Sequence, residues 1–446
     1  MVGSIEADIT QFAVGQGGFM VGRIRRTGQD ALREFTYAFD CGSINREHFE
    51  KGLDACDLSR LDVLFISHLD VDHVNGIDAL ASKMQIDCVV LPCLDALQSI
   101  AVACEGVEGA GVRVSVASLL RDPVAWFGER GVRSVYFVER DTSGEGPDAP
   151  GAPPGLSPPD APRPGGDRRW HKPRDGEGER FAYSITGERQ SAVEQVKTSR
   201  GKVEYATFGG DVQVDVEIAA SALTSAPLTW TLIPYVHPFS KTTLDLFVLA
   251  ASGVLKKKVS TGTGLAAKSF TKQLLAVLLD ETSRKALKAC YAMLTYDNNR
   301  PSMSLYSGPV KPLHPARILH NVISDGGEHF WHPRYSQDME HSAWLSTGDA
   351  DLGSLQTRTP WLRRYQRFLR EVAVFVLPHH GSNRHIHDDV LGHMPCSLMV
   401  ACADTKRKKH PHPDLRKRLL LLGGQSIVQV SERQPSELTL QVKLFE

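Results

Sequence analysis

The sequence predicts an α/β protein built in layers, and two observations support this prediction. From about residue 62 onward, apolar runs of strand length alternate with helix-like runs. Alternation of this kind is typical of sheets that have helices packed on them. The second observation is that histidine and aspartate side chains repeatedly follow directly after a strand-like run. These residues therefore indicate a candidate site where the strands end.

The amino-terminal part of the chain predicts a sheet that opens with hairpins. Strand-like runs at 9–14, 19–24 and 35–39 are separated by turn-forming residues, among them Gly15-Gln16-Gly17-Gly18. A buried strand is expected at 61–66, because this run is apolar and has strand length. Beyond it we expect helices at 77–84 and 94–104 and strands at 86–91 and 112–118.

The remainder of the chain returns mainly to strands. A helix is expected at 267–292, where apolar residues recur at helical spacing, and another from Trp361. Strands are expected at 212–218, 228–236, 302–306, 343–346, 372–377, 398–403, 427–430 and 438–444.

The chain is long enough for several domains or for one elaborated domain, and we interpret residues 1–446 as a single elaborated domain. A segment rich in proline and glycine, at about 141–180, contains too little apolar sequence to offset the entropy of ordering it. It therefore predicts a loop-like insertion. Further material between about 185 and 300 is expected to be additional to the basic fold.

Composition is that of an ordinary globular protein, with 41% hydrophobic residues, 23% charged residues and a formal net charge of -1. This charge argues against a protein that coats polyanions, although a local basic site remains compatible with it. The first residues resemble no secretory signal, and no apolar run approaches the roughly 20 residues that cross a bilayer. The eight cysteines are scattered without a paired C-x-x-C. We therefore expect a cytoplasmic protein that does not contact membranes.

The residues that directly follow the buried strand at 61–66 contain the strongest chemical signal. His68, Asp70, Asp72 and His73 lie within six positions. Alternate side chains of an extended loop point to one side, so His68, Asp70 and Asp72 can converge while His73 turns toward a second centre. Nitrogen and carboxylate ligands mixed in this way suit zinc or manganese. The alternative interpretation is a surface loop that is merely rich in aspartate and histidine.

Three later strand-like runs end in the same way. Thr347-Gly348 leads to Asp349, whose two carboxylate oxygens can bridge two cations, although a lone aspartate there also fits a turn. The run at 372–377 delivers His379-His380-Gly381-Ser382, and two adjacent histidines at this position are hard to explain by packing. The run at 398–403 leads to His410-Pro411-His412-Pro413. A candidate site is thus assembled from strand ends that are far apart in the sequence.

Together, in order, these motifs resemble the metallo-β-lactamase fold superfamily. The resemblance is closest to the soluble hydrolase domain of ComEC-type DNA-uptake competence proteins, in which H-x-D-x-D-H replaces the H-x-H-x-D-H found in most of the superfamily. It extends from about residue 6 to about residue 420 and includes the early Val14-Gly15-Gln16-Gly17 and Asp40-Cys41-Gly42. The membrane-channel part of those proteins has no counterpart in this sequence.

The resemblance implies an αββα sandwich with the metal site at the edge of its two sheets. It implies one or two zinc ions, with manganese as the alternative, and a metal-bound hydroxide as the nucleophile. The implied ligands are His68, Asp70, Asp72, His73, Asp349, His380 and His410. The implied catalytic residues are Asp72, which orients the nucleophile, and His379 or His380, which protonates the leaving group.

One departure from the superfamily concerns its third-motif histidine. His237 follows a strand and is the only candidate for that role, with a loop histidine as the equally weighted alternative. His412 is a further candidate because it lies two residues after His410.

Basic and polar residues beside these motifs predict a substrate that carries phosphate. Ser382 and Arg384 follow the histidine pair and can hold a phosphate oxygen. Lys408 and Lys409, with Lys406 and Arg407, directly precede His410. Positive charge also clusters at the lysines 256–258 and at the arginines 363, 364, 367 and 370. The alternative interpretation is that these runs are solvated surface, as charge runs usually are.

Our first hypothesis is therefore hydrolysis of phosphodiester bonds in DNA or RNA. One alternative is hydrolysis of a small phosphodiester or ester, such as a cyclic nucleotide or a phosphorylcholine-like group. The other alternative is a non-catalytic component of a larger complex, in which the proline-rich insertion contacts a protein partner.

Overall fold

The structure is a computed structural model that describes most of the chain. The described residues are 4–27, 33–93, 118–119, 122–139, 167–171, 180–219, 228–237, 249, 253, 282, 286, 302–310, 318–325, 330–331, 341–394, 397–407, 409–423 and 425–445.

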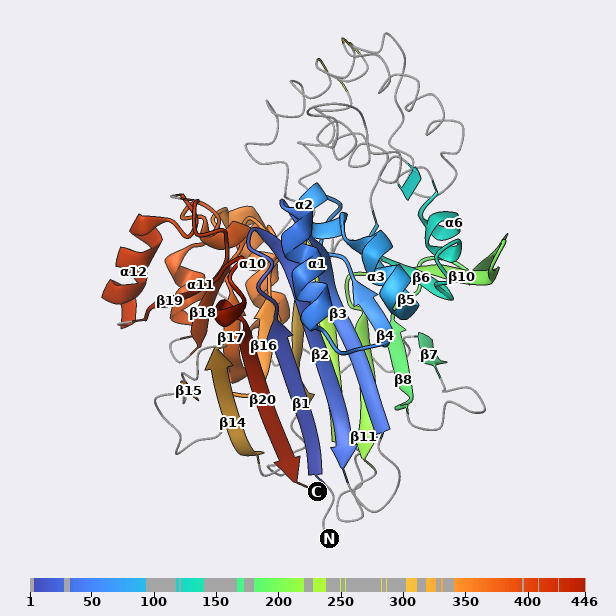
Figure 1. Cartoon of the computed structure of the whole chain (residues 1–446), viewed down its shortest axis with the longest axis horizontal. Helices are drawn as coiled ribbons and strands as arrows, with labels where there is room; N and C mark the ends of the chain where they lie inside the picture. The colour runs from blue at the N-terminus through green and yellow to red at the C-terminus, as the bar shows by residue number, and fades with distance from the viewer. Residues whose placement is uncertain are drawn as a thin grey trace, which may run out of the picture.

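Within these residues, the strands form two large mixed sheets (Figure 1). The first sheet has the order β15 (Phe330–Trp331), β14 (Ile318–Asp325), β20 (Leu438–Phe445), β1 (Ser4–Gln11), β2 (Gly17–Thr27), β3 (Arg33–Ser43), β4 (Arg60–Phe65), β5 (Gln85–Pro92), β6 (Ser134–Val138), β10 (Gly201–Phe208) and β9 (Glu194–Thr198). The second has the order β19 (Ile427–Val430), β18 (Leu398–Cys402), β17 (Val372–Val376), β16 (Ala343–Ser346), β13 (Met303–Val310), β12 (Leu228–Val236), β11 (Gln213–Ala219), β8 (Tyr183–Gly187) and β7 (Asp167–His171).

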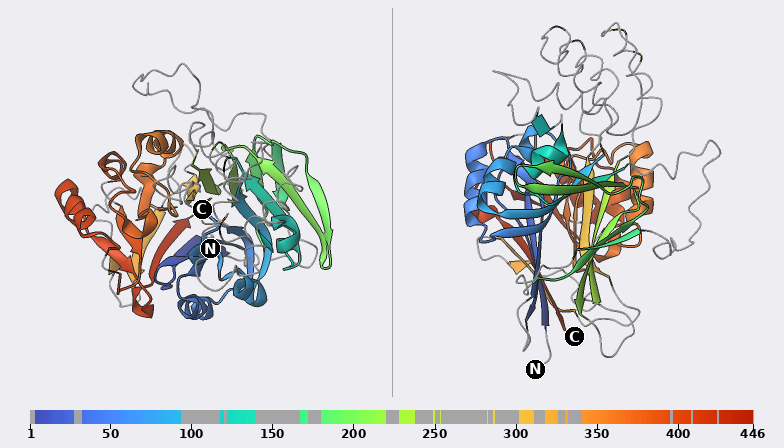
Figure 2. Two further views of the ribbon diagram at one scale, coloured as in Figure 1. Left: turned by 90° about the horizontal axis from the view of Figure 1, so that it is seen from above. Right: turned by 90° about the vertical axis from the view of Figure 1, so that its right-hand side faces the viewer.

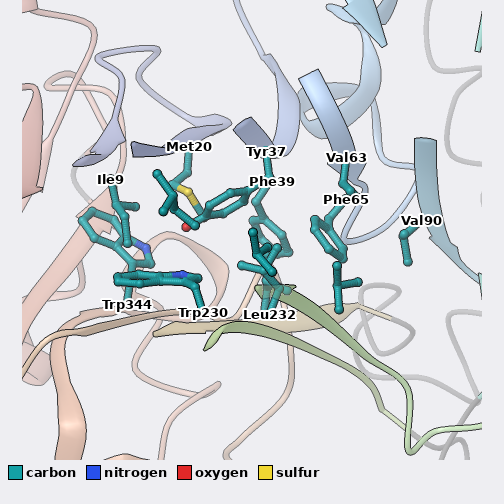
Figure 3. Close-up of a cluster of buried hydrophobic side chains, with 14 of the residues drawn as sticks. Ile9, Met20, Tyr37, Phe39, Val63, Phe65, Val90, Trp230, Leu232 and Trp344 are labelled. Atoms are coloured by element: carbon teal, nitrogen blue, oxygen red, sulfur yellow. The ribbon is translucent and has the colours of Figure 1, made fainter. Parts of the chain in front are cut away.

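The two sheets pack face to face across one apolar core. Side chains from β1 to β5, such as Ile9 and Tyr37, meet Trp230, Leu232 and Trp344 from the second sheet, and all of these are buried (Figure 3). Strand side chains alternate between the two faces of a sheet, so each strand contributes every second residue to this core. This core fixes the two sheets relative to each other.

Helices cover the outer faces of both sheets (Figure 2). On the first sheet, α1 (Arg46–Ala55), α3 (Ile77–Lys83) and α6 (Pro123–Gly128) bury a second apolar cluster that includes Phe49 and Leu80. On the second sheet, α10 (Leu355–Tyr365), α11 (Asp388–Gly392) and α12 (Pro413–Gly423) bury a third cluster around Trp361. The predicted α/β class is confirmed, and the arrangement is compatible with a layered α/β sandwich.

Most predicted strands in the described residues are confirmed, several of them with the same ends. The strands expected at 228–236, 343–346 and 427–430 are β12, β16 and β19. The predictions for 94–104, 112–117 and most of 267–292 lie outside the described residues, and Ser118, the last residue of one predicted strand, is helical.

One prediction about an inserted segment differs from the structure. Asp167–His171, inside the segment expected to be a loop, forms β7 and pairs antiparallel with β8. The ring of His171 stacks on that of Tyr183, with ring centroids 4.7 Å apart. This pairing with the next strand along the chain outweighs the local composition. The remaining residues of 141–179 lie outside the described part. Strands β8 to β12, between 183 and 236, belong to the two sheets themselves.

The topology brings several strand ends together at one end of the molecule. In the first sheet β3, β4 and β5 run parallel, and in the second β16, β17 and β18 do so. Residues that follow parallel strands meet at the same sheet edge. The turn after β4 is joined to the second sheet by the Met303 N–H, which donates to the Ser67 carbonyl at 2.7 Å. Among the described residues, no helix is long and apolar enough to cross a membrane.

Candidate metal centre

The first sheet contributes two buried histidines to the candidate centre. His68 follows β4 directly, and His73 lies in the short helix α2 (Val71–Val74), which begins after Asp70. The His73 N–H donates to the Asp70 carbonyl at 3.0 Å and closes the turn. Because the turn folds the chain back, His68 and His73 lie with their ring centroids 4.1 Å apart.

The second sheet contributes Asp349 and His380. Asp349 follows β16, and its backbone N–H donates to Ser302 Oγ at 2.9 Å. His380 follows β17 in the 3-10 turn η3 (His379–Gly381). Both side chains are almost completely buried. The centre therefore joins residues that are 276 to 312 positions apart in the sequence.

Asp349 lies among three histidines. Its Oδ1 atom is 3.6 Å from His73 Nε2 and 4.0 Å from His380 Nε2, and its Oδ2 atom is 3.9 Å from His68 Nε2. These separations are longer than hydrogen bonds. Two ligands that bind one tetrahedral ion at ~2.1 Å lie roughly 3.4 Å apart. The spacing therefore suits atoms that share a cation better than atoms bonded to each other.

Asp72 completes a second group beside the first. Its Oδ2 atom lies 3.5 Å from His380 Nε2 and 4.0 Å from His73 Nε2. The ligand atoms of His68, His73 and Asp349, and likewise those of Asp72, His73 and His380, lie within 4.8 Å of one another. The Nε2 atoms of His68 and His73 are buried without a hydrogen-bond partner, which is costly unless a ligand satisfies them. The side chains can thus hold a cation.

Asp40, which lies in the last part of β3, orients two of these histidines. Its Oδ2 atom accepts a hydrogen bond from His73 Nδ1 at 2.8 Å and another from Ser67 Oγ at 2.7 Å. Because the Ser67 hydroxyl donates to Asp40, its lone pair is available to His68 Nδ1, 2.8 Å away. With Nδ1 of each ring turned to these partners, both Nε2 atoms face the centre. Such outer carboxylates are a regular feature of metal-binding histidines.

His380 is oriented in the same way by a backbone group. Its Nδ1 atom lies 2.8 Å from the carbonyl oxygen of Cys402 at the end of β18. A carbonyl oxygen can only accept, so the proton lies on Nδ1 and Nε2 keeps its lone pair. All three histidines at the centre therefore present the nitrogen that a metal requires.

Backbone strain is concentrated at these positions. Asp40, His379 and His380 have φ values of 61°, 48° and 56°, in the left-handed region that side chains rarely adopt. Such conformations cost of order 1–3 kcal/mol each and persist where the surroundings hold them. Gly42, which follows two residues after Asp40, permits a close approach, because a Cβ atom there would lie 2.6 Å from the Asp72 carbonyl oxygen.

The acidic groups of the centre stay ionised despite their burial. Burial by itself raises the pKa of Asp72, but His73 and then His380 lower it to about 2. Burial likewise opposes ionisation of Asp349, yet the nearby histidines, His379 first, hold its pKa well below the ordinary range. Burial lowers the pKa of His73, whereas Asp40, Asp72 and Asp349 raise it to about 10. Without a metal, a proton on His73 balances these carboxylates, and a cation bound at the centre would displace that proton.

Two other predicted ligands lie at the border of the centre. Asp70 Oδ2 is 3.5 Å from His68 Nε2, so Asp70 can join the first group. The ring of His410 lies 6.2 Å from that of His380 and is parallel to that of His379 at 5.7 Å. Burial, followed by His380 and His379, lowers the pKa of His410 to about 4. His410 is not in either of the two ligand groups defined above.

His237 and His412 make their contacts elsewhere. His237 is completely buried, with Nε2 3.4 Å from Ser304 Oγ and its ring edge-on to Tyr235. Burial lowers its pKa to about 3, as expected for a neutral core histidine. His412 is partly exposed and accepts a hydrogen bond from the Asp414 N–H in the first turn of α12. The structure does not bring either side chain to the centre.

The predicted phosphate-binding residues surround the centre only in part. Arg384 and Lys409 are exposed, and Lys408 lies outside the described residues. Ser382 Oγ forms a hydrogen bond with His385 Nδ1 at 2.7 Å. Of the arginines near α10, Arg364 donates to the Val212 carbonyl, and Arg367 lies over the Phe368 ring. The cluster at 256–258 also lies outside the described part.

Sequence reasoning missed Asp40, Ser67 and His385 as site residues. Asp40 could have been found, because Asp40-Cys41-Gly42 follows a strand just as the ligand motifs do. Nothing in the sequence marks Ser67 or His385, because their role depends on the positions of neighbouring rings.

Comparisons with known proteins add no assignment. No protein-family model matches this chain, and no curated protein sequence matches it. The conclusions about function that follow therefore rest on the sequence motifs and on the geometry of the candidate centre.

Proposed function

We propose that this chain is a metal-dependent hydrolase that cleaves phosphodiester bonds in DNA or RNA. The observation that carries the proposal is the orientation of the histidines. His68, His73 and His380 each engage Nδ1 with a neighbour and leave Nε2 beside Asp72 and Asp349. A cluster of core histidines would not need three separately oriented rings around ionised carboxylates.

We further propose that the fold is of the metallo-β-lactamase type. Two mixed sheets packed face to face, with helices outside and candidate ligands at the strand ends, support this assignment. The order of the motifs in the chain supports it as well, from His68 through Asp349 and His380 to His410. The position of His237 supports the expected departure, in which the third-motif histidine is lacking.

The ligand set suits zinc, with manganese as the alternative. The group of Asp72, His73 and His380 has two nitrogens and one carboxylate, which is typical of zinc. The group of His68, His73 and Asp349, when Asp70 joins it, has two nitrogens and two carboxylates, which is also compatible with manganese. When bound, a divalent cation supplies Lewis-acid chemistry, which makes water acidic enough to serve as a nucleophile near neutral pH.

The residues of the chain have separate roles in this proposal. Asp72, held ionised, accepts a hydrogen bond from the attacking water and orients it toward phosphorus. His379, next to the ligand His380, supplies the proton that the leaving oxygen needs. Arg384 and Lys409, which are exposed and close in sequence to His380 and His410, hold non-bridging phosphate oxygens.

Local charge supports a nucleic acid as the substrate. Lys406, Arg407 and Lys409 are exposed on the loop that connects β18 to His410. Phosphate contacts by such residues supply most of the sequence-independent affinity for nucleic acids. The overall charge of -1 indicates that this affinity is local to the loop.

The test is incubation of the purified protein with labelled linear and circular DNA and with RNA, in the presence of zinc, manganese or a chelator. We expect metal-dependent cleavage that is lost in His68→Ala/Asp72→Ala. The matched control is His393→Ala/Asp54→Ala, in which both side chains are exposed, and it should cleave like the wild type. Failure of the wild type to cleave any polymer would refute the nuclease proposal, and cleavage of a small chromogenic diester alone would favour the small-substrate alternative.

A further inference from the structure

His385 is a buried histidine that belongs to neither ligand group. It lies between η3 and α11, and only 7% of it is exposed. Its carbonyl oxygen accepts from the Leu352 N–H at 2.8 Å, and Ile386 forms a bridge with Leu352. The backbone of His385 is therefore fixed to the segment that follows Asp349.

Both ring nitrogens of His385 have polar neighbours. Nε2 lies 3.3 Å from His379 Nδ1, and Nδ1 lies 2.7 Å from Ser382 Oγ. The ring centroids of His379 and His385 are 4.3 Å apart. The three side chains thus form a hydrogen-bonded row that ends at the Nδ1 edge of His379, and the opposite edge of that ring carries Nε2.

His379 needs such support because its backbone is strained. Its φ value of 48° lies in the left-handed region, and the two residues that follow it, His380 and Gly381, also have positive φ. His379 belongs to neither ligand group, although its charge lowers the pKa of the ligand Asp349. Its ring is a neighbour both of the His385 ring and of the parallel ring of His410.

We propose that His385 is a positioning residue, which through its hydrogen bond to His379 Nδ1 fixes the ring that faces the leaving group of the substrate. This inference rests on the proposed function, because it assigns His379 a task in that reaction. Ser382 is the outer member of the row and holds His385 rather than a phosphate oxygen.

The test compares two substitutions at His385. His385→Phe keeps a ring of similar size but removes both nitrogens, and His385→Gln restores a polar group at a similar reach. The control is His393→Phe, because His393 is exposed and lies outside the row. Each variant is assayed on a dinucleotide, whose leaving oxygen needs a proton, and on bis(4-nitrophenyl) phosphate, whose leaving group departs without one.

We expect His385→Phe to lower kcat on the dinucleotide about 10- to 100-fold, the effect typical of residues that orient others at metal sites. KM should stay unchanged, activity on the nitrophenyl diester should fall much less, and His385→Gln should recover most of the loss. An equal loss on both substrates, or no loss on either, would overturn the proposal.

A measurement that does not depend on activity separates this inference from the proposed function. Imidazole ¹⁵N NMR of the full chain reports whether His379 Nδ1 is hydrogen-bonded, and we expect its resonance to shift in His385→Phe and to move back toward the wild-type position in His385→Gln. An unchanged His379 spectrum would refute positioning even if the protein is a nuclease. A shifted spectrum in a protein that cleaves nothing would uphold the positioning of the ring and refute the proposed reaction.

Discussion

Asp40 Oδ2 lies 2.8 Å from His73 Nδ1, so a residue outside the ligand groups determines how His73 faces the candidate centre. The same oxygen accepts the Ser67 hydroxyl and thereby also fixes His68. One buried carboxylate thus orients two rings. This arrangement makes the affinity for metal depend on a residue that is not itself a ligand.

Replacement of Asp40 should therefore weaken metal binding. Asp40→Asn keeps the size of the side chain, and asparagine tolerates the left-handed backbone at this position. We expect the dissociation constant for zinc to rise about 10- to 100-fold. Competition with a chromophoric chelator measures it, and Asp54→Asn, at an exposed aspartate, is the control. Equal affinities in the two variants would contradict the role of Asp40.

Metal should stabilise the wild-type fold through Asp349. A ligand that binds only the folded state at 100 times its dissociation constant adds about 2.7 kcal/mol to the free energy of unfolding. We expect zinc or manganese to raise Tm in the wild type and to leave it nearly unchanged in Asp349→Asn. Differential scanning calorimetry with and without chelator provides the measurement. A metal-induced rise of equal size in Asp349→Asn would show that the ion binds elsewhere.

Gly42 should not tolerate a side chain. A Cβ atom at this position would lie 2.6 Å from the carbonyl oxygen of Asp72, a backbone atom that cannot move without shifting α2. We expect Gly42→Ala to destabilise the fold by about 1–3 kcal/mol and to weaken metal binding. Gly392→Ala is the control, because nothing lies within 4 Å of its added Cβ. Chemical denaturation measures the free energy of unfolding of both variants, and metal titration measures their affinity for metal. Equal values in Gly42→Ala and Gly392→Ala would contradict the close contact between Gly42 and Asp72.

His237 should make stability depend on pH. Its pKa is lowered by burial from 6.5 to about 3, so the unfolded chain binds a proton that the folded chain does not. The contribution of neutral His237 to the free energy of unfolding is fully present above about pH 6.5 and is lost as the pH falls toward 3. Between pH 7.5 and pH 5 we expect the free energy of unfolding to fall by about 2 kcal/mol more in the wild type than in His237→Phe.

The measurement for His237 is urea denaturation across this range of pH. The comparison uses the slope of the free energy of unfolding against pH. A change in packing caused by phenylalanine is the same at every pH and therefore does not affect this slope. His393→Phe, at an exposed histidine, should retain the slope of the wild type. A His237→Phe slope equal to that of the wild type would show that this histidine titrates normally.

Arg180 should be important for stability. It is mostly buried and pairs with Asp62 and Glu34 on the first sheet, and it also donates to Thr36 Oγ1. Removal of one partner leaves a buried charge uncompensated, which costs about 3–5 kcal/mol. We expect Arg180→Met to lower the free energy of unfolding by about 3 kcal/mol and Arg180→Met/Asp62→Asn to recover part of it.

The control for Arg180 is Arg46→Met, because the Arg46–Glu50 pair is about half exposed. Surface pairs contribute roughly 0–1 kcal/mol. Chemical denaturation measures all three variants. If Arg180→Met lowers the free energy of unfolding no more than Arg46→Met does, the buried network is not important for stability.

Much of the fold could be predicted from the sequence where local patterns determine the structure. The apolar runs at 61–66 and 372–377 predicted β4 and β17, because a buried strand requires a short apolar run whatever its partners are. β7 could not be predicted, because its residues are polar and its stability comes from pairing with β8. Composition favoured a loop there, whereas pairing with β8, the next strand along the chain, made this segment a strand.

The candidate site likewise has one part that the sequence predicted and another that it could not predict. The sequence by itself determined the kinds of side chain that follow each strand, including His68, Asp72, Asp349 and His380, because ligand chemistry depends on residue type. Only the tertiary structure decided that these four converge, that His237 is a core histidine, and that Asp40 and His385 orient rings. The physical reason is that hydrogen bonds and metal ligation act over about 3 Å. Distances of that size between residues hundreds of positions apart are fixed by how the two sheets pack.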